Sequence, residues 1–320
     1  MADPVPAAPV SAAPEAAAAL AEGLPRARGA ASTALRRLIR DPAALAGIVV
    51  IAAATVAAAG APLLAPYSPQ TPHYGQSLAG PDTRFLLGTD GLGRDELSRL
   101  LYGARVSLAS VAVATLAIVV VGLALGLVSG YLGGIADSLV QRVIEIVMAF
   151  PSLVLALVIA GILGPSVHSV VIAVVAVHWA SYARLVRGMV LSAREQRYVE
   201  AARGVGAGNL RIMLTEILPN VLSPVIVLAT LELGGLLLAI SSLSFLGLGA
   251  QPPTPEWGTM LNEARPYFES HVYLMVVPGV AITLLVLAFN LVGDGLRDAL
   301  DPRRAVLVTD ARRRRPRPAR

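Results

Sequence analysis

Long apolar runs alternate with short polar segments over most of this chain. Between Ala44 and Val292 there is enough apolar length for six helices of about 20 residues, the number needed to cross a hydrocarbon core about 30 Å thick. We expect these helices at residues 44–64, 106–136, 146–183 (two helices), 221–243 and 272–292. The pattern therefore predicts an all-α integral membrane protein with six transmembrane helices.

The third apolar run is too long for one helix. From Ile146 to Ala183 the chain has 38 residues without a charge, and a helix of that length would measure about 57 Å, nearly twice the membrane thickness. Residues 164–166, Gly-Pro-Ser, interrupt the run with a sequence that favours a turn. We therefore expect two helices joined by a hairpin turn there, and we expect Pro151 to kink the first of them.

The distribution of arginine predicts the orientation in the membrane. The chain has 26 arginines and no lysine, and cytoplasmic segments of membrane proteins carry an excess of basic residues. If the N-terminus is cytoplasmic, 21 arginines fall on the inner side and 5 on the outer side. We therefore expect both termini in the cytoplasm of a bacterial cell, with the longest cytoplasmic loop between the fourth and fifth helices.

Composition supports a membrane protein and excludes several kinds of site. Hydrophobic residues make up 55% of the chain and charged residues 15%, whereas a soluble domain of this size needs more charge to cover its surface. The absence of cysteine excludes thiolate sites, and no two histidines stand at i and i+4, so we expect no metal. Without lysine the chain cannot hold a GxxxxGK[ST] phosphate loop. We expect no cofactor here, and any ATP must be bound by a separate protein.

Three parts of the chain differ in composition. Residues 1–34 are rich in Ala and Pro and predict a disordered cytoplasmic tail, residues 35–304 hold the six-span domain, and residues 305–320 form a basic disordered tail. The basic run is expected to attract anionic membrane lipids by about 1 kcal/mol per nearby arginine. Nucleic-acid binding is less favoured, because no folded domain or aromatic platform accompanies the run.

The cytoplasmic loop at residues 192–219 predicts two short helices around a glycine-rich turn. Ser192 and Glu195 fit a capping box, which predicts a helix over residues 193–203. Three glycines then interrupt the helix, Asn209 is a suitable cap for a second helix, and Pro219 is expected to end it. The second helix has one apolar face: Leu210, Met213, Leu214, Ile217 and Leu218. Such a loop either lies on lipid or on its own bundle, or it is a docking site for a partner.

Two outer segments are expected to form short interfacial helices. Asp95 can cap a helix that leads into the second span, with its apolar residues on one face. That face is expected to hold Leu97, Leu100, Leu101 and Ala104. In the second segment Thr254 can cap a helix and Pro255 suits its first position. Aromatic residues there suit a belt at the membrane–water interface: Trp257, Tyr267 and Phe268.

Glu232 lies well inside the fifth predicted span. A charged group in that position costs about 2.5–3.5 kcal/mol on insertion scales, so it is expected to face the bundle interior or a wet pathway, or to be protonated. A pathway-lining role and a structural hydrogen bond are both compatible with the sequence.

The cytoplasmic loop also carries a motif of a known family. Glu200-Ala201-Ala202 is followed after three residues by Gly206 and then, twelve residues on, by Leu218-Pro219. This spacing resembles the EAA loop of permeases in binding-protein-dependent ABC importers. The resemblance implies that Glu200 tethers the loop to a cytoplasmic ATPase or to its own helix, that the two alanines allow close approach, and that Gly206 supplies the turn.

Several longer blocks resemble the C-type permease subunits of dipeptide and oligopeptide importers (the DppC/OppC group), from about residue 35 to 304. They are FLLGTDGLGRDELSRLLYGARVSL, GYLGGIADSLVQR with AFPSL, SYARLVRGMVLSAREQRYVEAARGVGA, SFLGLGAQPPTPEWGTML and NLVGDGLRDALDPR. The resemblance implies a type I importer-like permease fold and no enzymatic activity in this chain. It also implies three kinds of partner: a homologous second permease, two cytoplasmic ATPase subunits and an extracytoplasmic solute-binding protein. In this family the segment around Trp257, Tyr267 and Phe268 would form a scoop or gate facing the binding protein.

Two other classes of protein compete with this interpretation. A secondary transporter that works alone could be driven by ions through Glu232, but the chain shows no internal repeat and only one acid deep inside a span. A polytopic membrane enzyme would need paired carboxylates, a metal cluster or a nucleophile with its base, and the sequence offers none of these. The transported solute cannot be identified from the sequence: dipeptides, oligopeptides, nickel chelates and glutathione all fit.

Overall fold

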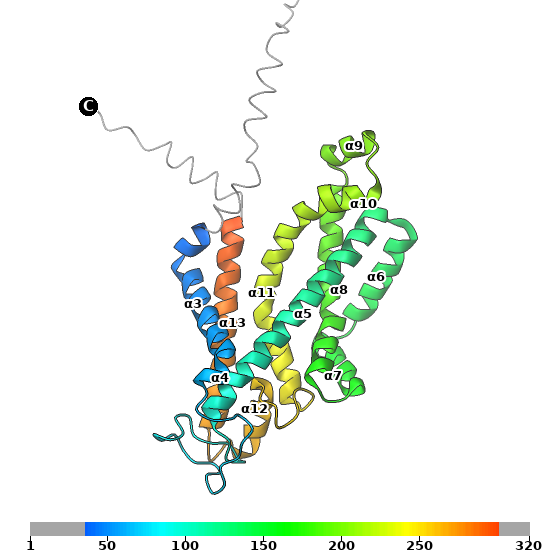
Figure 1. The fold of residues 1–320 in the computed structure, drawn as a ribbon. Helices are drawn as coiled ribbons and strands as arrows, with labels where there is room; N and C mark the ends of the chain where they lie inside the picture. The colour runs from blue at the N-terminus through cyan, green and yellow to red at the C-terminus, as the bar shows by residue number, and fades with distance from the viewer. Residues whose placement is uncertain (1–35, 301–320) are drawn as a thin grey trace, which may run out of the picture.

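The computed structural model describes residues 36–300, and this part of the chain is almost entirely helical (Figure 1). The predicted all-α class is confirmed: over residues 36–300 the one β feature is an isolated bridge between Thr89 and Asp95. Our interpretations of the two tails, residues 1–34 and 305–320, lie outside the described residues. The elements in chain order are α3 (Pro42–Ala59), α4 (Ala61–Leu64), α5 (Glu96–Leu132), α6 (Gly134–Met148), α7 (Ser152–Leu163), α8 (Val167–Ala193), α9 (Arg197–Gly204), α10 (Asn209–Arg211), η1 (Ile212–Ile217), α11 (Leu218–Phe245), α12 (Trp257–Ala264), η2 (Arg265–Tyr267) and α13 (Tyr273–Leu300).

Within residues 36–300, five helices are long and apolar enough to cross a membrane. They are α3, α5, α8, the continuous helix formed by α10, η1 and α11, and α13. A sixth crossing results if α6 and α7 count as one broken span, since they are joined by a break of a few residues and bend by 93°. Pro151 was expected to kink a helix here, and the structure shows a full break: α6 ends at Met148 and Pro151 caps α7. Proline has no N–H to continue the helical ladder, which favours this break.

The hairpin predicted at residues 164–166 is confirmed. α7 ends at Leu163, and Gly164 has a φ of +84°, a conformation that glycine adopts without strain. Ser166 then caps α8, because its hydroxyl accepts a hydrogen bond from the Ser169 N–H. The Ser166 N–H donates to Leu248 O at 3.0 Å, so the hairpin lies beside the chain that follows α11.

The second span begins earlier than expected. Its predicted start was after Arg105, but α5 is one helix of 37 residues that starts at Glu96. The separate capped entry helix is therefore the first part of the span itself. The predicted cap is confirmed, since the Asp95 carboxylate accepts a hydrogen bond from the Ser98 N–H at 2.8 Å.

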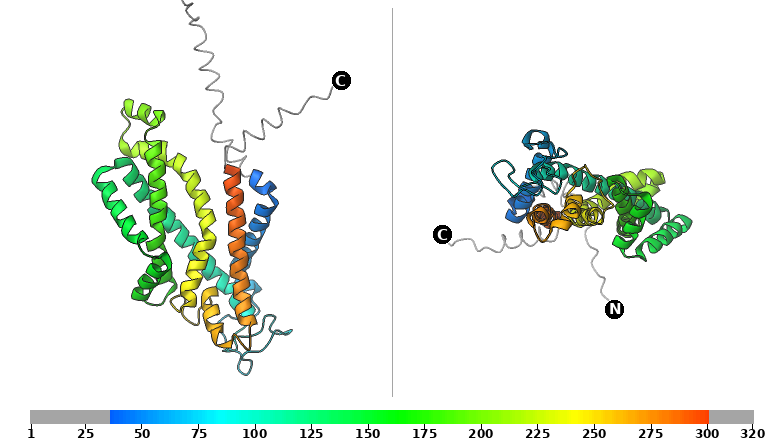
Figure 2. Two further views of the ribbon diagram at one scale, coloured as in Figure 1. Left: turned by 180° about the vertical axis from the view of Figure 1, so that it is seen from behind. Right: turned by 90° about the horizontal axis from the view of Figure 1, so that it is seen from below.

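The helices form an elongated array with its two ends differently built. Seen from below, α3 and α13 lie at one edge of the array and α6 and α7 at the other (Figure 2). Along the helix direction, α9 and α10 project beyond one end, while α12 and the segment before α5 gather at the opposite end (Figure 1). The start of α3 and the end of α13 lie at the same end as α9 and α10.

Helices α5 and α8 approach each other closely along a row of glycines. Three glycines of α5 at four-residue spacing, Gly122, Gly126 and Gly130, face α8. A Cβ atom at Gly126 would lie 2.6 Å from the Cβ of Val186, and one at Gly130 would lie 2.8 Å from the Cβ of Val190. Small residues at such spacing allow the backbones of two membrane helices to approach closely. α5 and α8 therefore pack as one closely fitted pair.

Candidate functional site

The projecting end of the molecule is a helix–turn–helix that we call the bracket, residues 197–211. It consists of α9, a turn, and α10, and it continues without a break into η1 and α11. The first bracket helix was predicted, but its start was wrong. Ser192 lies inside α8 and is not a cap; α9 begins only after Gln196, which has no side-chain capping bond. The reason is that α8 remains helical through Ala193, so no free helix start exists at Ser192.

Gly206 forms the turn of the bracket through its backbone conformation. Its φ is +82°, its N–H donates to Arg203 O, and the Ala207 N–H donates to Ala202 O. These two bonds form a Schellman motif, in which the residue with positive φ is commonly glycine. A Cβ atom at Gly206 would meet nothing within 4 Å. The requirement for glycine is therefore conformational and not a matter of space.

The remaining motif residues lie on α9 within the bracket and at the start of α11. Glu200 and Ala201 are exposed, and Ala202 is half-buried. The Glu200 carboxylate has no hydrogen-bond or ion-pair partner within residues 36–300, so among these residues nothing tethers it to its own helix. Leu218 is half-buried and Pro219 is exposed at the start of α11.

Two details of the second bracket helix differ from the prediction. Asn209 is not its cap, because the capping position belongs to Gly208. Pro219 does not end the helix, because residues 212–217 widen into the π-helical segment η1 and the chain then continues as α11. A proline removes one backbone donor and crowds the carbonyl four residues before it, and π-helical turns are a known way to absorb such a disturbance.

The π-helical segment also changes which apolar residues are buried. Ile212 and Ile217, five positions apart, are fully buried, whereas Leu210 and Leu214 are exposed. Val205 at the turn is 86% exposed, so this part of the chain presents three exposed apolar side chains: Val205, Leu210 and Leu214. The predicted single apolar face is therefore divided between the bundle and the surface.

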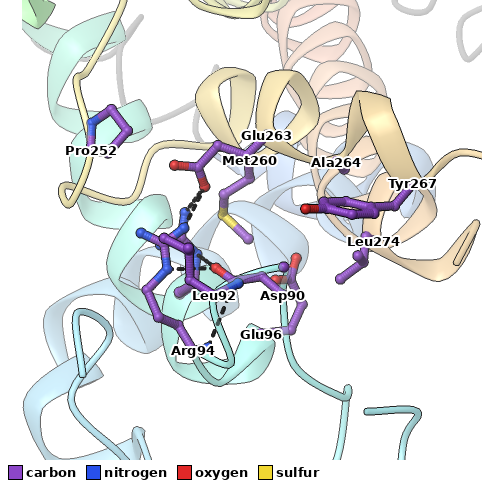
Figure 3. A pocket seen from close by; sticks show the side chains of 12 residues that line it. Asp90, Leu92, Arg94, Glu96, Pro252, Met260, Glu263, Ala264, Tyr267 and Leu274 are labelled. Atoms are coloured by element: carbon purple, nitrogen blue, oxygen red, sulfur yellow. Dashed lines mark hydrogen bonds and ion pairs between the residues drawn. The ribbon is translucent and has the colours of Figure 1, made fainter. Parts of the chain in front are cut away.

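The opposite end of the molecule contains a buried ionic cluster that the sequence did not predict (Figure 3). The Arg94 Nε lies 2.6 Å from an oxygen of Asp90, and the Arg94 Nη2 lies 2.9 Å from an oxygen of Glu263 on α12. Arg99 contacts the same two carboxylates, and its side chain is only 1% exposed. We call these four residues the outer ionic cluster. It joins the segment before α5, the first turn of α5, and α12.

The buried face of the first α5 turns is therefore polar. Asp95, Glu96, Ser98 and Arg99 are buried. Of the four residues predicted to share one apolar face, Ala104 is buried and Leu97, Leu100 and Leu101 are half-buried. A cavity of about 190 Å³ lies beside the cluster and is also lined by Tyr267 (Figure 3). Asp90, Arg94 and Arg99 lie close together in sequence, but Glu263 joins them only in the folded chain, so no local pattern reveals the complete cluster.

Helix α12 is held to α5 by a buried tryptophan. Trp257 is 3% exposed, and its Nε1–H donates to Leu100 O at 3.0 Å. The expectation that Trp257 lies in an interfacial aromatic belt is therefore wrong: it packs against Gly103 inside the protein. The cap of α12 is Glu256, which accepts hydrogen bonds from two backbone N–H groups, and not Thr254, so Pro255 precedes the helix.

The other two aromatic candidates at the outer end remain partly accessible. Phe268 is 56% exposed and Tyr267 is half-buried beside the cavity. These two residues are available at the surface for a contact with another molecule.

Glu232 is half-buried in α11, where its carboxylate lies next to the hydroxyl of Tyr182 on α8. The two groups interact, but their geometry does not make a hydrogen bond, and both Glu232 Oε2 and the Tyr182 hydroxyl are buried without a hydrogen-bond partner among residues 36–300. Glu232 therefore faces a neighbouring helix inside the bundle, as its cost in a lipid environment requires. This position fits both a structural role and a role beside a pathway.

No group of three or more His, Asp or Glu side chains is arranged to hold a metal ion within residues 36–300. The candidate functional features are thus the bracket at one end, the aromatic and ionic groups at the other end, and Glu232 between them.

Comparison with known proteins gives consistent matches. Residues 122–306 match the family model described as "binding-protein-dependent transport system inner membrane component", and residues 31–81 match the "N-terminal TM domain of oligopeptide transport permease C". The chain is 43% identical over 270 residues to the dipeptide transport system permease protein DppC of Alkalihalophilus pseudofirmus, which covers 84% of this chain and 89% of that protein.

Two further relatives are similarly close. The di/tripeptide transport system permease protein DppC of Pseudomonas aeruginosa is 46% identical over 81% of this chain and 88% of its own length. The nickel transport system permease protein NikC of Escherichia coli is 42% identical over 82% of this chain and 94% of its own length.

Proposed function

We propose how this chain works from one premise: it belongs to the family of binding-protein-dependent transport system inner membrane components. It is therefore an integral membrane permease subunit of an ABC importer and not an enzyme. We propose that it imports short peptides or related small solutes, since its relatives are named for dipeptide, di/tripeptide and nickel transport.

The proposed topology has six spans, with both termini and the bracket in the cytoplasm. α6 and α7 then form one broken span, which makes an even number of crossings and returns both ends of the described chain to the side of the bracket. The excess of arginine on that side supports the cytoplasmic assignment.

The bracket is proposed to be the coupling site for the ATPase subunits. Three apolar side chains in or next to the bracket, Val205, Leu210 and Leu214, are exposed and offer apolar area that a partner can bury. Glu200, which is exposed and unpaired within residues 36–300, is available for a cation of the partner. The projecting position of the bracket carries this proposal, because nothing else in the described chain extends so far beyond the helical array at that end (Figure 1).

The mechanism follows from the connections of the bracket. ATP binding would bring the two ATPase subunits together and move the bracket with them. Because the bracket is continuous with α11 and follows α8 directly, its movement would tilt both helices and change which side of the membrane the pathway faces. ATP and magnesium would be bound by the ATPase subunits and not by this chain.

Assembly is proposed to require three kinds of partner. A homologous second permease would supply the other half of the pathway, two ATPase subunits would bind the two brackets, and a solute-binding protein would dock at the opposite end. There, Phe268 and Tyr267 are accessible for a gate-like contact. Trp257 would support this segment from inside, because it is buried against α5.

The substitution Gly206→Val tests the coupling role. Valine at a φ of +82° is strained, because its branched side chain clashes with the backbone there, so the turn is expected to open. In proteoliposomes containing the full complex, we expect ATP hydrolysis to continue while uptake of a labelled dipeptide falls at least tenfold.

Gly208→Val is the matched control for this experiment. Gly208 has a φ of −70°, which any residue adopts, and a Cβ atom there meets nothing within 4 Å. We expect its uptake to stay within about twofold of the unmodified complex. Normal uptake by the Gly206→Val complex would refute the coupling role of the bracket.

A further inference from the structure

The end of α5 lies beneath the bracket and contacts both of its arms through one side chain. Tyr131 is buried in the core, and its hydroxyl donates a hydrogen bond to Asn209 Oδ1 at 3.2 Å. The guanidinium carbon of Arg203 lies 5.4 Å from the centre of the Tyr131 ring, within range of a cation–π contact. Arg203 belongs to α9 and Asn209 to α10, so Tyr131 joins the two helices on either side of the Gly206 turn.

Tyr131 stands on a firmly fixed part of the bundle. Gly130, its neighbour in sequence, packs against Val190 of α8, and Gly130 O accepts a hydrogen bond from Arg194 at the end of α8. Six residues after Tyr131, beyond the end of α5, Asp137 in the first turn of α6 makes two hydrogen bonds of 2.6 Å with the guanidinium of Arg187 on α8. The end of α5 is therefore fixed to the end of α8 on both sides of Tyr131.

The other attachments of the bracket lead elsewhere. The Asn220 side chain donates to the Tyr198 hydroxyl at 3.4 Å and so joins α9 to α11. Between the bracket and α11 lies the π-helical segment η1, a form of helix that often occurs where a helix bends or adjusts. Without a lateral attachment, part of any bracket movement would be lost in η1.

We propose that Tyr131 is a positioning residue that fixes the angle between the two arms of the bracket and joins the bracket to the α5–α8 pair. Movement of the bracket then moves α5 and α8 together, in addition to α11. This inference rests on the proposed coupling role of the bracket. It identifies Tyr131 as the contact through which movement of the bracket is passed to α5.

The substitution Tyr131→Phe tests this inference with the loss of one oxygen atom. Phenylalanine keeps the ring beneath Arg203 but loses the hydrogen bond to Asn209. Asn209 is exposed, so water can satisfy its amide and the fold is retained. We expect the complex to assemble with normal amounts of ATPase, while the ATP hydrolysed per labelled dipeptide transported rises about two- to tenfold, the range that corresponds to one net hydrogen bond.

Asn209→Ala and the double variant separate positioning from general stability. Asn209→Ala removes the acceptor of the same hydrogen bond and is expected to raise the ATP-to-dipeptide ratio by a similar factor. The double variant is expected to be no worse than either single variant, because both changes remove one interaction. A purely structural contribution of Tyr131 would instead lower the amount of assembled complex and leave the ratio unchanged.

Tyr273→Phe is the matched control at the other end of the molecule. It also deletes one hydroxyl that makes hydrogen bonds, in this case to Ala79 O at 2.9 Å and Thr89 O at 3.2 Å. Tyr273 is the first residue of α13, which begins at the end of the array opposite the bracket (Figure 1). For Tyr273→Phe we expect the ATP hydrolysed per labelled dipeptide transported to equal that of the unmodified complex.

The outcomes distinguish this inference from the proposed function. If Gly206→Val uncouples the complex while Tyr131→Phe and Asn209→Ala both keep a normal ratio, the role of Tyr131 is refuted and the bracket keeps its role. If neither Gly206→Val nor the Tyr131 variant changes the ratio, the coupling role of the bracket fails as well. Additive effects in the double variant, or an equal effect of Tyr273→Phe, would also overturn the role of Tyr131.

Discussion

The two ends of this permease are built on opposite principles. At the outer end, two buried arginines bind two carboxylates, a buried tryptophan joins α12 to α5, and the side chains of Asp95 and Glu256 cap the starts of α5 and α12. At the bracket end, neither α9 nor α10 has a side-chain cap, the tip is exposed, and the turn depends on one glycine. The outer end is thus fixed by many interactions within the chain, whereas the bracket leaves most of its surface for a partner.

This difference suggests where stability and coupling are located. Substitutions at the outer end are expected to lower the free energy of unfolding, while substitutions at the bracket are expected to alter the use of ATP with little effect on unfolding. Gly206→Val tests the expectation for the bracket, and Arg99→Leu tests the expectation for the outer end.

The largest effect on stability is expected from Arg99→Leu. Arg99 is almost fully buried and contacts both carboxylates of the outer ionic cluster, so its loss leaves two carboxylates to share the single guanidinium of Arg94. Breaking a buried ion pair from one side costs about 3–5 kcal/mol. Thermal unfolding of the purified complex in detergent measures this cost as a lower Tm.

Arg142→Leu is the control for this prediction. Arg142 also pairs with an acid, Glu145, at 3.2 Å, but the two side chains are 77% and 64% exposed. Exposed pairs contribute about 0–1 kcal/mol, so we expect little change in Tm. Equal Tm values for the two variants would show that the outer ionic cluster does not stabilise the protein.

The smallest effect is expected at Glu232, between the two ends. Glutamine has the same shape and can still interact with the Tyr182 hydroxyl, so Glu232→Gln is expected to keep ATP-driven uptake within about twofold. The measurement is uptake of a labelled dipeptide with ATP present and no proton gradient. A loss of uptake above tenfold would show that an ionised Glu232 is needed and would favour a role for Glu232 in the pathway or in ion coupling.

The sequence predicted the elements whose causes are local. The turn at residues 164–166 followed from an apolar run too long for one helix, and the cap at Asp95 followed from its side chain and position. The glycine-rich spacing predicted a turn after α9, and the family resemblance implied that Gly206 supplies it, which is consistent with its positive φ. In each case the deciding residues lie within a few positions of one another.

The features that the sequence missed depend on contacts between distant segments. Trp257 fits an interfacial belt because it is an aromatic residue in an outer segment, but Gly103 on α5 leaves room for its ring inside the protein. The contact of Tyr131 with Arg203 and Asn209 joins positions more than 70 residues apart. Ser192 fits a capping box, but the preceding helix continues through it. Local patterns give no information about such neighbours.

The central claim is that the bracket lies in the cytoplasm and binds an ATPase subunit, and single cysteines test it directly. The chain has no cysteine of its own, so Val205→Cys at the exposed tip and Phe268→Cys at the outer end each introduce one accessible thiol into the full complex. We predict that in intact cells a membrane-impermeant thiol reagent labels Cys at position 268 but not at position 205, and that a short bifunctional crosslinker joins position 205 to the ATPase. Labelling of position 205 from outside, or crosslinking of the ATPase at position 268, would contradict the account.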